Sequence, residues 1–371
     1  MADLSRTKPP FRADHVGSLL RPAALAEARR AFKAGRMAGG QLREIEDREI
    51  LAAIRMQEDI GLKGITDGEF RREYWHLDFL SGFHGIETRK EYFNQAFSTG
   101  ILVPTPYTHA KITGHSGAMR EHIRFVVENT KQTAKLSIPG PGMTYLRGGR
   151  NSVSSDAYPD LEEFWNDLAD AYIGEIRELG KAGCTYLQID DVSFAYLCDE
   201  NFRKGVLERG DDPDEMLAQF SRVTSRIAAG RPEGMAVTVH MCRGNNQSAW
   251  MTEGGYDKVA EIMFANLDVD GYFMEFDSER AGGFEPLRFV PEGKQVVAGV
   301  VTSKFPQLES VDEIRRRIDE AAKYIPLENL CLSPQCGFAS TEEGNKLTPD
   351  EQRRKLERVV EAAGTIWGGS C

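Results

Sequence analysis

Two side chains that commonly bind transition metals stand two positions apart at the end of a largely apolar run. The run Met235–Val239 has the composition of a buried strand, and His240 and Cys242 follow it directly. Alternate side chains of a strand lie on one face, so this imidazole and this thiol can reach a single ion. An isolated pair of this kind is more often a packed histidine and a buried thiol. Whether this pair binds a metal therefore depends on the residues at the other strand ends.

The chain alternates short β-rich runs with longer stretches of helical apolar spacing, which predicts βα units around a parallel sheet. Eight strands with returning helices are typical of a TIM (β/α)8 barrel. The expected strands are 13–18, 64–69, 134–140, 185–190, 235–240, 271–276, 295–301 and 330–334. The expected helices are 44–60, 161–182, 213–229, 256–266, 311–324 and 349–366.

One insertion, residues 75–130, interrupts this rhythm with aromatic residues, prolines and five histidines. We interpret it as an elaborated loop over the carboxyl-terminal mouth of the barrel. Alternating residues at 110–113 and 123–127 predict a hairpin within it. No linker marks a domain boundary, so residues 1–371 are expected to form a single domain.

The carboxyl ends of the strands carry the active site in such a barrel, and here they carry chemical groups. Glu275 and Cys336 end the sixth and eighth expected strands, and with His240 and Cys242 they make a four-group set. Nitrogen, sulfur and oxygen donors of this kind suit tetrahedral Zn²⁺, whereas Mg²⁺ and Ca²⁺ prefer oxygen. Two thiolates and a carboxylate overcompensate a +2 charge, which makes water a poor nucleophile there. Alkylation of a substrate thiol fits this site better than hydrolysis.

Composition limits the partners. The 371 residues carry a formal net charge of −11, which argues against nucleic-acid and anionic-membrane surfaces. We find no signal-peptide core and no apolar run of membrane-spanning length, so we expect a cytoplasmic protein. Six scattered cysteines do not form a secreted disulfide framework. A small-molecule substrate is expected, and a homo-oligomer is left open.

The strand-end motifs, taken in order, resemble the catalytic barrel of cobalamin-independent methionine synthase, that is, 5-methyltetrahydropteroyltriglutamate–homocysteine methyltransferase. The similarity extends through most of the chain. Its pieces are Asp-His-Val-Gly-Ser at 14–18, Thr-Asp-Gly-Glu-Phe at 66–70, Leu-Gln-Ile-Asp at 187–190, Val-His-Met-Cys at 239–242, Phe-Met-Glu at 273–275 and Ser-Pro-Gln-Cys-Gly at 333–337.

The resemblance implies a zinc ion held by His240, Cys242, Glu275 and Cys336, and a homocysteine thiolate that takes a methyl group from 5-methyltetrahydrofolate polyglutamate. It also implies that Gly17, Ser18, Glu69 and Asp190 hold the amino-acid end of homocysteine, with Glu69 and Asp190 serving the catalytic site. Apart from the resemblance, Glu69 and Asp190 could equally be helix N-caps.

Three departures from the family pattern leave the methyl donor open. The chain is too short for the second, N-terminal barrel of the full-length enzymes, and Asp191-Val192 replaces a usual Glu-Pro. Thr302-Ser303-Lys304 stands where the family has a proton-delivering histidine, and Lys304 is expected to be a solvated or structural cation. The alternatives are methyl transfer from a corrinoid, addition of a small thiol to an epoxide, a zinc hydrolase that uses Asp190 or Glu69 as base, and a non-catalytic metal or thiol sensor.

Overall fold

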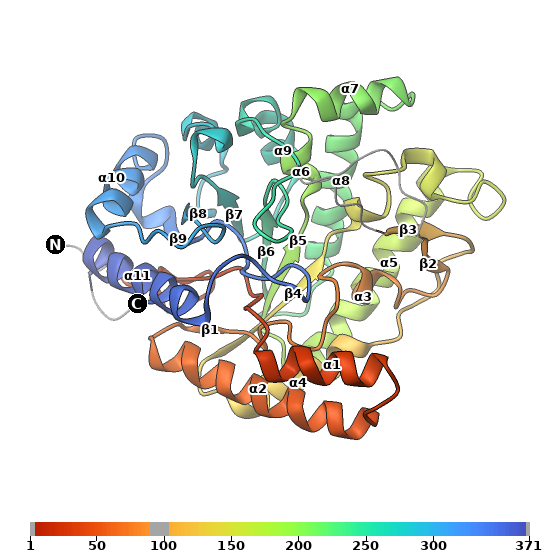
Figure 1. Cartoon of the computed structure of the whole chain (residues 1–371). Helices are drawn as coiled ribbons and strands as arrows, with labels where there is room; N and C mark the ends of the chain where they lie inside the picture. Colours follow the sequence, from red (N-terminus) through yellow and green to blue (C-terminus); the bar gives the residue numbers. More distant parts are fainter. Residues whose placement is uncertain (1–3, 90–103, 369–371) are drawn as a thin grey trace.

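A curled parallel sheet of seven strands forms the centre of the molecule (Figure 1). The computed structural model describes residues 4–89 and 104–368. Neighbouring strands are joined in the order β1-β4-β5-β6-β7-β8-β9, which is the order along the chain. Their bounds are β1 Gly64–Ile65, β4 Thr133–Pro139, β5 Tyr186–Asp190, β6 Ala236–Met241, β7 Gly271–Glu275, β8 Gln295–Val301 and β9 Leu330–Pro334. This is the α/β barrel class that the sequence predicts.

The two edges of the sheet are joined by the segment that precedes β1. On one side, the Asp14 amide donates to the Leu332 carbonyl of β9 at 2.9 Å. On the other side, the hydroxyl of Thr66 donates to the Gly17 carbonyl at 2.7 Å, and the Leu19 amide donates to the Gly68 carbonyl at 3.0 Å. The segment therefore occupies the place of an eighth strand between β9 and β1.

The predicted strands at 13–18 and 64–69 are wrong in their extent. Ala13 makes one isolated bridge to Leu332, and β1 ends at Ile65. Positive φ angles at Gly17 (136°), Gly68 (67°) and Glu69 (61°) take the last residues of both predicted strands out of the extended conformation. These two stretches become turns at the mouth of the barrel.

Helices surround the sheet (Figure 1). Side-chain caps begin several of them, including Asp212 before Pro213 and the capping boxes of Ser310 with Glu313 and Thr348 with Glu351. None of the described helices is long and apolar enough to cross a bilayer. The α-helices are α1 Ala23–Lys33, α2 Gly39–Asp59, α3 Leu77–Leu80, α4 Ala118–Asn129, α5 Leu161–Lys181, α6 Ser193–Tyr196, α7 Glu200–Glu208, α8 Pro213–Ala229, α9 Ala260–Asn266, α10 Val311–Ala321 and α11 Pro349–Trp367.

The hairpin of the insertion is not where the sequence places it. Strands β2 (Ile86–Arg89) and β3 (Thr105–Thr108) pair antiparallel, whereas residues 123–127 belong to helix α4. The buried residues Met119, Ile123 and Val126 of α4 have the three-to-four-residue spacing of a helix face, which the short alternation at 123–127 obscures. Helix α4 is thus one of the barrel helices. Residues 90–103 of the insertion lie outside the described residues.

A buried cluster fills the barrel interior below the mouth. It contains apolar side chains from β5, β7, β8, β9 and the segment that precedes β1: Phe11, Val16, Tyr186, Phe273, Val297 and Cys331. An ion pair crosses this interior, with the Lys135 ammonium 2.9 Å from Oδ1 of Asp14. The Tyr186 hydroxyl donates to the other carboxylate oxygen of Asp14 at 2.8 Å. The floor beneath the mouth is therefore closed.

Candidate active site

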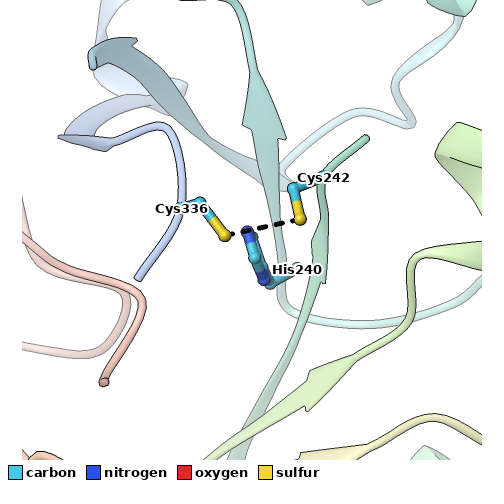
Figure 2. A group of neighbouring side chains, drawn as sticks. All are labelled: His240, Cys242 and Cys336. Carbon is cyan, nitrogen blue, oxygen red and sulfur yellow. Dashed lines mark hydrogen bonds between the residues drawn. The ribbon is translucent and has the colours of Figure 1, made fainter. Parts of the chain in front are cut away.

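Three of the four predicted metal ligands converge at the carboxyl ends of the strands (Figure 2). His240 lies in β6, Cys242 directly follows β6, and Cys336 follows β9. One ligand atom from each residue lies within 4.8 Å of the other two, and all three residues are buried. The alternation of β6 brings His240 and Cys242 to one face, and the closure of the sheet brings Cys336 beside them.

The imidazole of His240 is oriented by a carboxylate. Its Nδ1 lies 3.2 Å from Oδ1 of Asp190 in β5, while its buried Nε2 has no hydrogen-bond partner among the described residues. Burial disfavours the charged imidazole, but the hydrogen bond and the charge of Asp190 outweigh it and raise the pKa of His240. An imidazole fixed by a carboxylate with its second nitrogen unsatisfied is the usual arrangement of a metal-binding histidine.

The two thiols interact directly with each other. The sulfur of Cys336 donates to the sulfur of Cys242 over 3.4 Å (Figure 2). This hydrogen bond lowers the pKa of Cys242 to about 7 and raises the pKa of Cys336. The Cys242 thiol can therefore ionise near neutral pH. Together with the second thiol and the unsatisfied imidazole nitrogen, it makes a donor set that fits Zn²⁺.

Glu275, the fourth predicted ligand, lies outside this three-residue group. Its carboxylate accepts hydrogen bonds from the Arg243 amide at 2.8 Å and from the Arg280 guanidinium at 2.5 Å. Burial alone would raise its pKa, but Arg243 and the other nearby cations lower it, so Glu275 is ionised. Its charge is close enough to raise the pKa of Cys242. A metal bond to Glu275 remains a prediction.

A cavity opens above the metal group and contains most of the predicted substrate residues. Ser18, Glu69 and Asp190 line it together with the three metal-group residues. Gly17 does not line the cavity, and a Cβ at this position would lie 2.7 Å from Oγ of Ser137. The cavity is lined by Val16, Ser18, Glu69, Trp75, Arg147, Asp190, Val192, Tyr196, His240, Cys242, Gly244, Asn245, Cys336, Gly337 and Ser340.

Glu69 has the electrostatics of a functional carboxylate. It is buried, its φ is positive, and its Oε2 has no hydrogen-bond partner among the described residues. Burial and the charge of Asp190 raise its pKa to about 7, although Arg72, 3.7 Å away, opposes this shift. A strained, buried carboxyl that lacks a full set of partners is suited to receive a cationic group of a ligand.

The neighbouring acid Asp191 has a different role. Its carboxylate accepts from the amide and hydroxyl of Ser193 and from the Gly142 amide, which lies 3.2 Å away. Burial raises its pKa to about 6 against these hydrogen bonds. Asp191 therefore ties the loop after β4 to the turn after β5, while Asp190 faces the cavity.

Sequence reasoning missed several residues of the cavity, two of which have ionisable side chains. Arg147 and Tyr196 both line it, and both are buried. A weak signal existed, because Arg147 is the first charged residue after Lys135 of the third predicted strand. Lys304, expected to be solvated or structural, is 1% exposed and donates to the Gly244 carbonyl at 3.0 Å. It is structural and does not line the cavity.

Known proteins with similar sequences match almost the whole chain. The catalytic-domain model of the cobalamin-independent synthases matches residues 11–365. The protein YxjG of Bacillus subtilis, whose function is uncharacterized, is 44% identical over 98% of this chain and 97% of its own length. The 5-methyltetrahydropteroyltriglutamate–homocysteine methyltransferase of Mycobacterium leprae is 23% identical over 98% of this chain, which spans 44% of that larger protein.

Solved structures show the same fold. A crystal structure from Listeria monocytogenes, described as a candidate vitamin-B12 independent methionine synthase, is 34% identical and superposes with a TM-score of 0.78 over 98% of this chain and all of that one. A B12-independent methionine synthase from Shewanella, in complex with selenomethionine, shares the fold with a TM-score of 0.69 at 18% identity, over 96% of this chain and 97% of that one. The family model and the close relatives together lead to one conclusion: the chain belongs to the cobalamin-independent methionine synthase family, a family of methyltransferases.

Proposed function

We propose that the protein is a zinc-dependent thiol methyltransferase that converts homocysteine to methionine, with 5-methyltetrahydrofolate, in its polyglutamate form, as the methyl donor. The observation that carries this proposal is the sharing of one cavity by a buried His-Cys-Cys group and two carboxylates. Such a cavity suits a small molecule that has a thiol at one end and an ammonium at the other.

The metal would be held by His240, Cys242 and Cys336, with Glu275 as the predicted fourth ligand. The unsatisfied Nε2 of His240 and the paired sulfurs support this assignment. Bound zinc supplies Lewis acidity that lowers the pKa of a substrate thiol, so that the thiol reacts as a thiolate at neutral pH. Arg243 and Arg280 meanwhile keep Glu275 ionised and oriented beside the group.

The amino-acid end of the substrate would lie between β1 and β5. Glu69 and Asp190 provide negative charge for its ammonium, and both line the cavity. The turn at Gly17 and Ser18 provides polar groups for its carboxylate. Oγ of Ser18 accepts from the Ala339 amide at 3.3 Å, which leaves its own hydroxyl hydrogen free for a ligand.

The donor is the least constrained part of the proposal. Lys304 stands in place of the family's proton-delivering histidine, yet its ammonium binds the Gly244 carbonyl and is not part of the cavity lining. A folate leaving group would therefore need its proton from water or from another residue. Methyl transfer from a corrinoid and thiol addition to an epoxide remain alternative reactions of the same thiolate.

Metal analysis together with a donor panel tests the proposal. We expect one zinc per chain in the wild type, loss of zinc in Cys242→Ser and Cys336→Ser, and retention in Cys331→Ser, a buried thiol of the barrel interior. We then expect methionine from homocysteine with 5-methyltetrahydrofolate. Absence of zinc, or its retention in both ligand variants, would disprove the metal site. Turnover with methylcobalamin or an epoxide, but not with 5-methyltetrahydrofolate, would show that the folate is not the donor.

A reducing compartment suits these thiols, and we propose a cytoplasmic location. All five described cysteines are free, including Cys242 and Cys336, whose sulfurs are near neighbours. In an oxidising compartment this pair would be at risk of forming a disulfide, which would remove both zinc ligands.

A further inference from the structure

Arg147 is a positively charged side chain of the cavity to which the proposed function gives no role. Arg147 follows the short helical turn η1 (Pro141–Thr144) after β4 and lines the cavity, although it is only 8% exposed. Its Nε is buried and has no hydrogen-bond partner among the described residues. A buried guanidinium without a full set of partners is costly unless a ligand completes it.

The surroundings of Arg147 are weakly polar. Burial raises the pKa of Tyr196, while the charge of Arg147 and a hydrogen bond from it lower this pKa, so the two side chains are neighbours. Burial lowers the pKa of His76 well below its usual value, and the positive charge of Arg147 lowers it further, so that imidazole is neutral. Neither neighbour neutralises the guanidinium, so its charge is available to the cavity.

Charge in the rest of the cavity limits what Arg147 can bind. Glu69, Asp190 and the two thiols contribute negative or no charge to the lining, and among the lining residues that the structure describes, only Arg147 has a permanent positive charge. An anionic group is therefore repelled elsewhere and attracted here. The planar guanidinium matches a carboxylate with two parallel hydrogen bonds.

We propose that Arg147 is the carboxylate-binding residue of the cavity. The inference rests on the proposed function, because both substrates of that reaction carry carboxylates. One source is the α-carboxylate of the amino acid, which Arg147 would share with the Gly17-Ser18 turn. The other source is the glutamate part of the methyl donor. Either way, Arg147 contributes to substrate affinity without touching the metal group.

Calorimetry on the full-length protein tests this inference without turnover. The ligands are methionine, its decarboxylated analogue 3-(methylthio)propylamine, and 5-methyltetrahydrofolate. The variants are Arg147→Gln, Arg147→Lys and a control, Arg222→Gln, at an exposed position of α8. A lost charge-assisted hydrogen bond contributes about 1.5–3 kcal/mol, so we expect affinity for one carboxylate ligand to fall about 10- to 100-fold in Arg147→Gln.

The pattern of losses identifies the source. Weaker binding of methionine, with unchanged binding of its decarboxylated analogue, assigns Arg147 to the amino-acid carboxylate. Weaker binding of 5-methyltetrahydrofolate alone assigns it to the donor. Arg147→Lys should recover part of the lost affinity, and the control should match the wild type. Unchanged affinity for all three ligands, or an equal loss for the decarboxylated analogue, overturns the inference. Failure of the proposed function would instead appear as absence of zinc in the wild type.

Discussion

The sulfur atoms of Cys242 and Cys336 lie 3.4 Å apart, although 94 positions separate the two residues in the sequence. A disulfide bond is about 2.05 Å long, so only a small movement separates this pair from a covalent bond. The pKa of Cys242 is lowered to about 7, which makes it the attacking thiolate.

We therefore predict that metal removal makes this pair selectively oxidisable. After treatment with a chelator and a mild oxidant, peptide mapping under non-reducing conditions should show a Cys242–Cys336 disulfide. Zinc-loaded protein should resist. Cys184 and Cys331 serve as internal controls, because burial raises their pKa values to about 12 and about 11. Oxidation of either control cysteine before the pair would contradict the prediction.

A second prediction concerns the orientation of His240. Oδ1 of Asp190 lies 3.2 Å from Nδ1 of the imidazole and also accepts from the Gln188 amide group at 2.6 Å. Asp190→Asn removes the negative charge that orients and polarises the imidazole. We expect the dissociation constant for zinc, measured by competition with a chelator, to rise about 10- to 100-fold.

Asp191→Asn is the matched control for that measurement. Asp191 is also buried, but its carboxylate accepts from Ser193 and Gly142, and only its backbone amide, which the substitution keeps, donates to the His240 carbonyl. The control should lower stability and leave zinc affinity near that of the wild type. If both variants lose zinc equally, the effect comes from general disruption of the loop after β5 and not from the Asp190–His240 contact.

A third prediction follows from the raised pKa of Glu69. The folded protein keeps a proton on Glu69 up to about pH 7, whereas the unfolded chain releases it near 4.5. The folded state therefore binds more protons between these values, and the free energy of unfolding falls as the pH rises through this window. The destabilisation of the folded state by ionised Glu69 is fully present above pH 7.

Glu69→Gln should remove that destabilisation. We expect the variant to be more stable than the wild type by about 1–3 kcal/mol at pH 8, with little difference at pH 4.5, as measured by urea unfolding. Glu44→Gln, at an exposed position of α2, should show no such pH dependence. A constant difference at both pH values would show that Glu69 does not titrate in this range.

The sequence was sufficient for the end of β6, because the alternation of side chains along a strand is a local pattern. It predicted that His240 and Cys242 share a face, and the barrel class then brought Cys336, Glu69 and Asp190 to the same mouth. Both results follow from the local alternation of side chains and from the barrel topology, and short stretches of sequence are enough to predict these two features.

The remaining features depend on contacts between distant segments. The ion pairs of Glu275 with Arg243 and Arg280 come from loops whose paths no local pattern specifies. The same is true of Arg147, whose entry into the cavity depends on the turn after β4. The misplaced hairpin has another cause, because a five-residue alternation at 123–127 is too short to distinguish a strand from one face of a helix.

A last prediction concerns the floor of the barrel, where Lys135 and Asp14 form a fully buried ion pair at 2.9 Å. Burial lowers the pKa of Lys135, and the carboxylate of Asp14 opposes this shift. Removal of one partner leaves the other charge buried and unpaired. We expect Lys135→Met to lower the free energy of unfolding by about 3–5 kcal/mol in urea titrations.

The double variant Asp14→Asn/Lys135→Met distinguishes pairing from packing. Because both charges are then absent, its destabilisation should be smaller than the sum of the two single effects, with a coupling energy of about 1–3 kcal/mol. Additive losses would mean that each residue acts through its own neighbours. Asp14 accepts from the Phe11 amide and the Tyr186 hydroxyl, so that result would place its contribution in closing the barrel rather than in the ion pair.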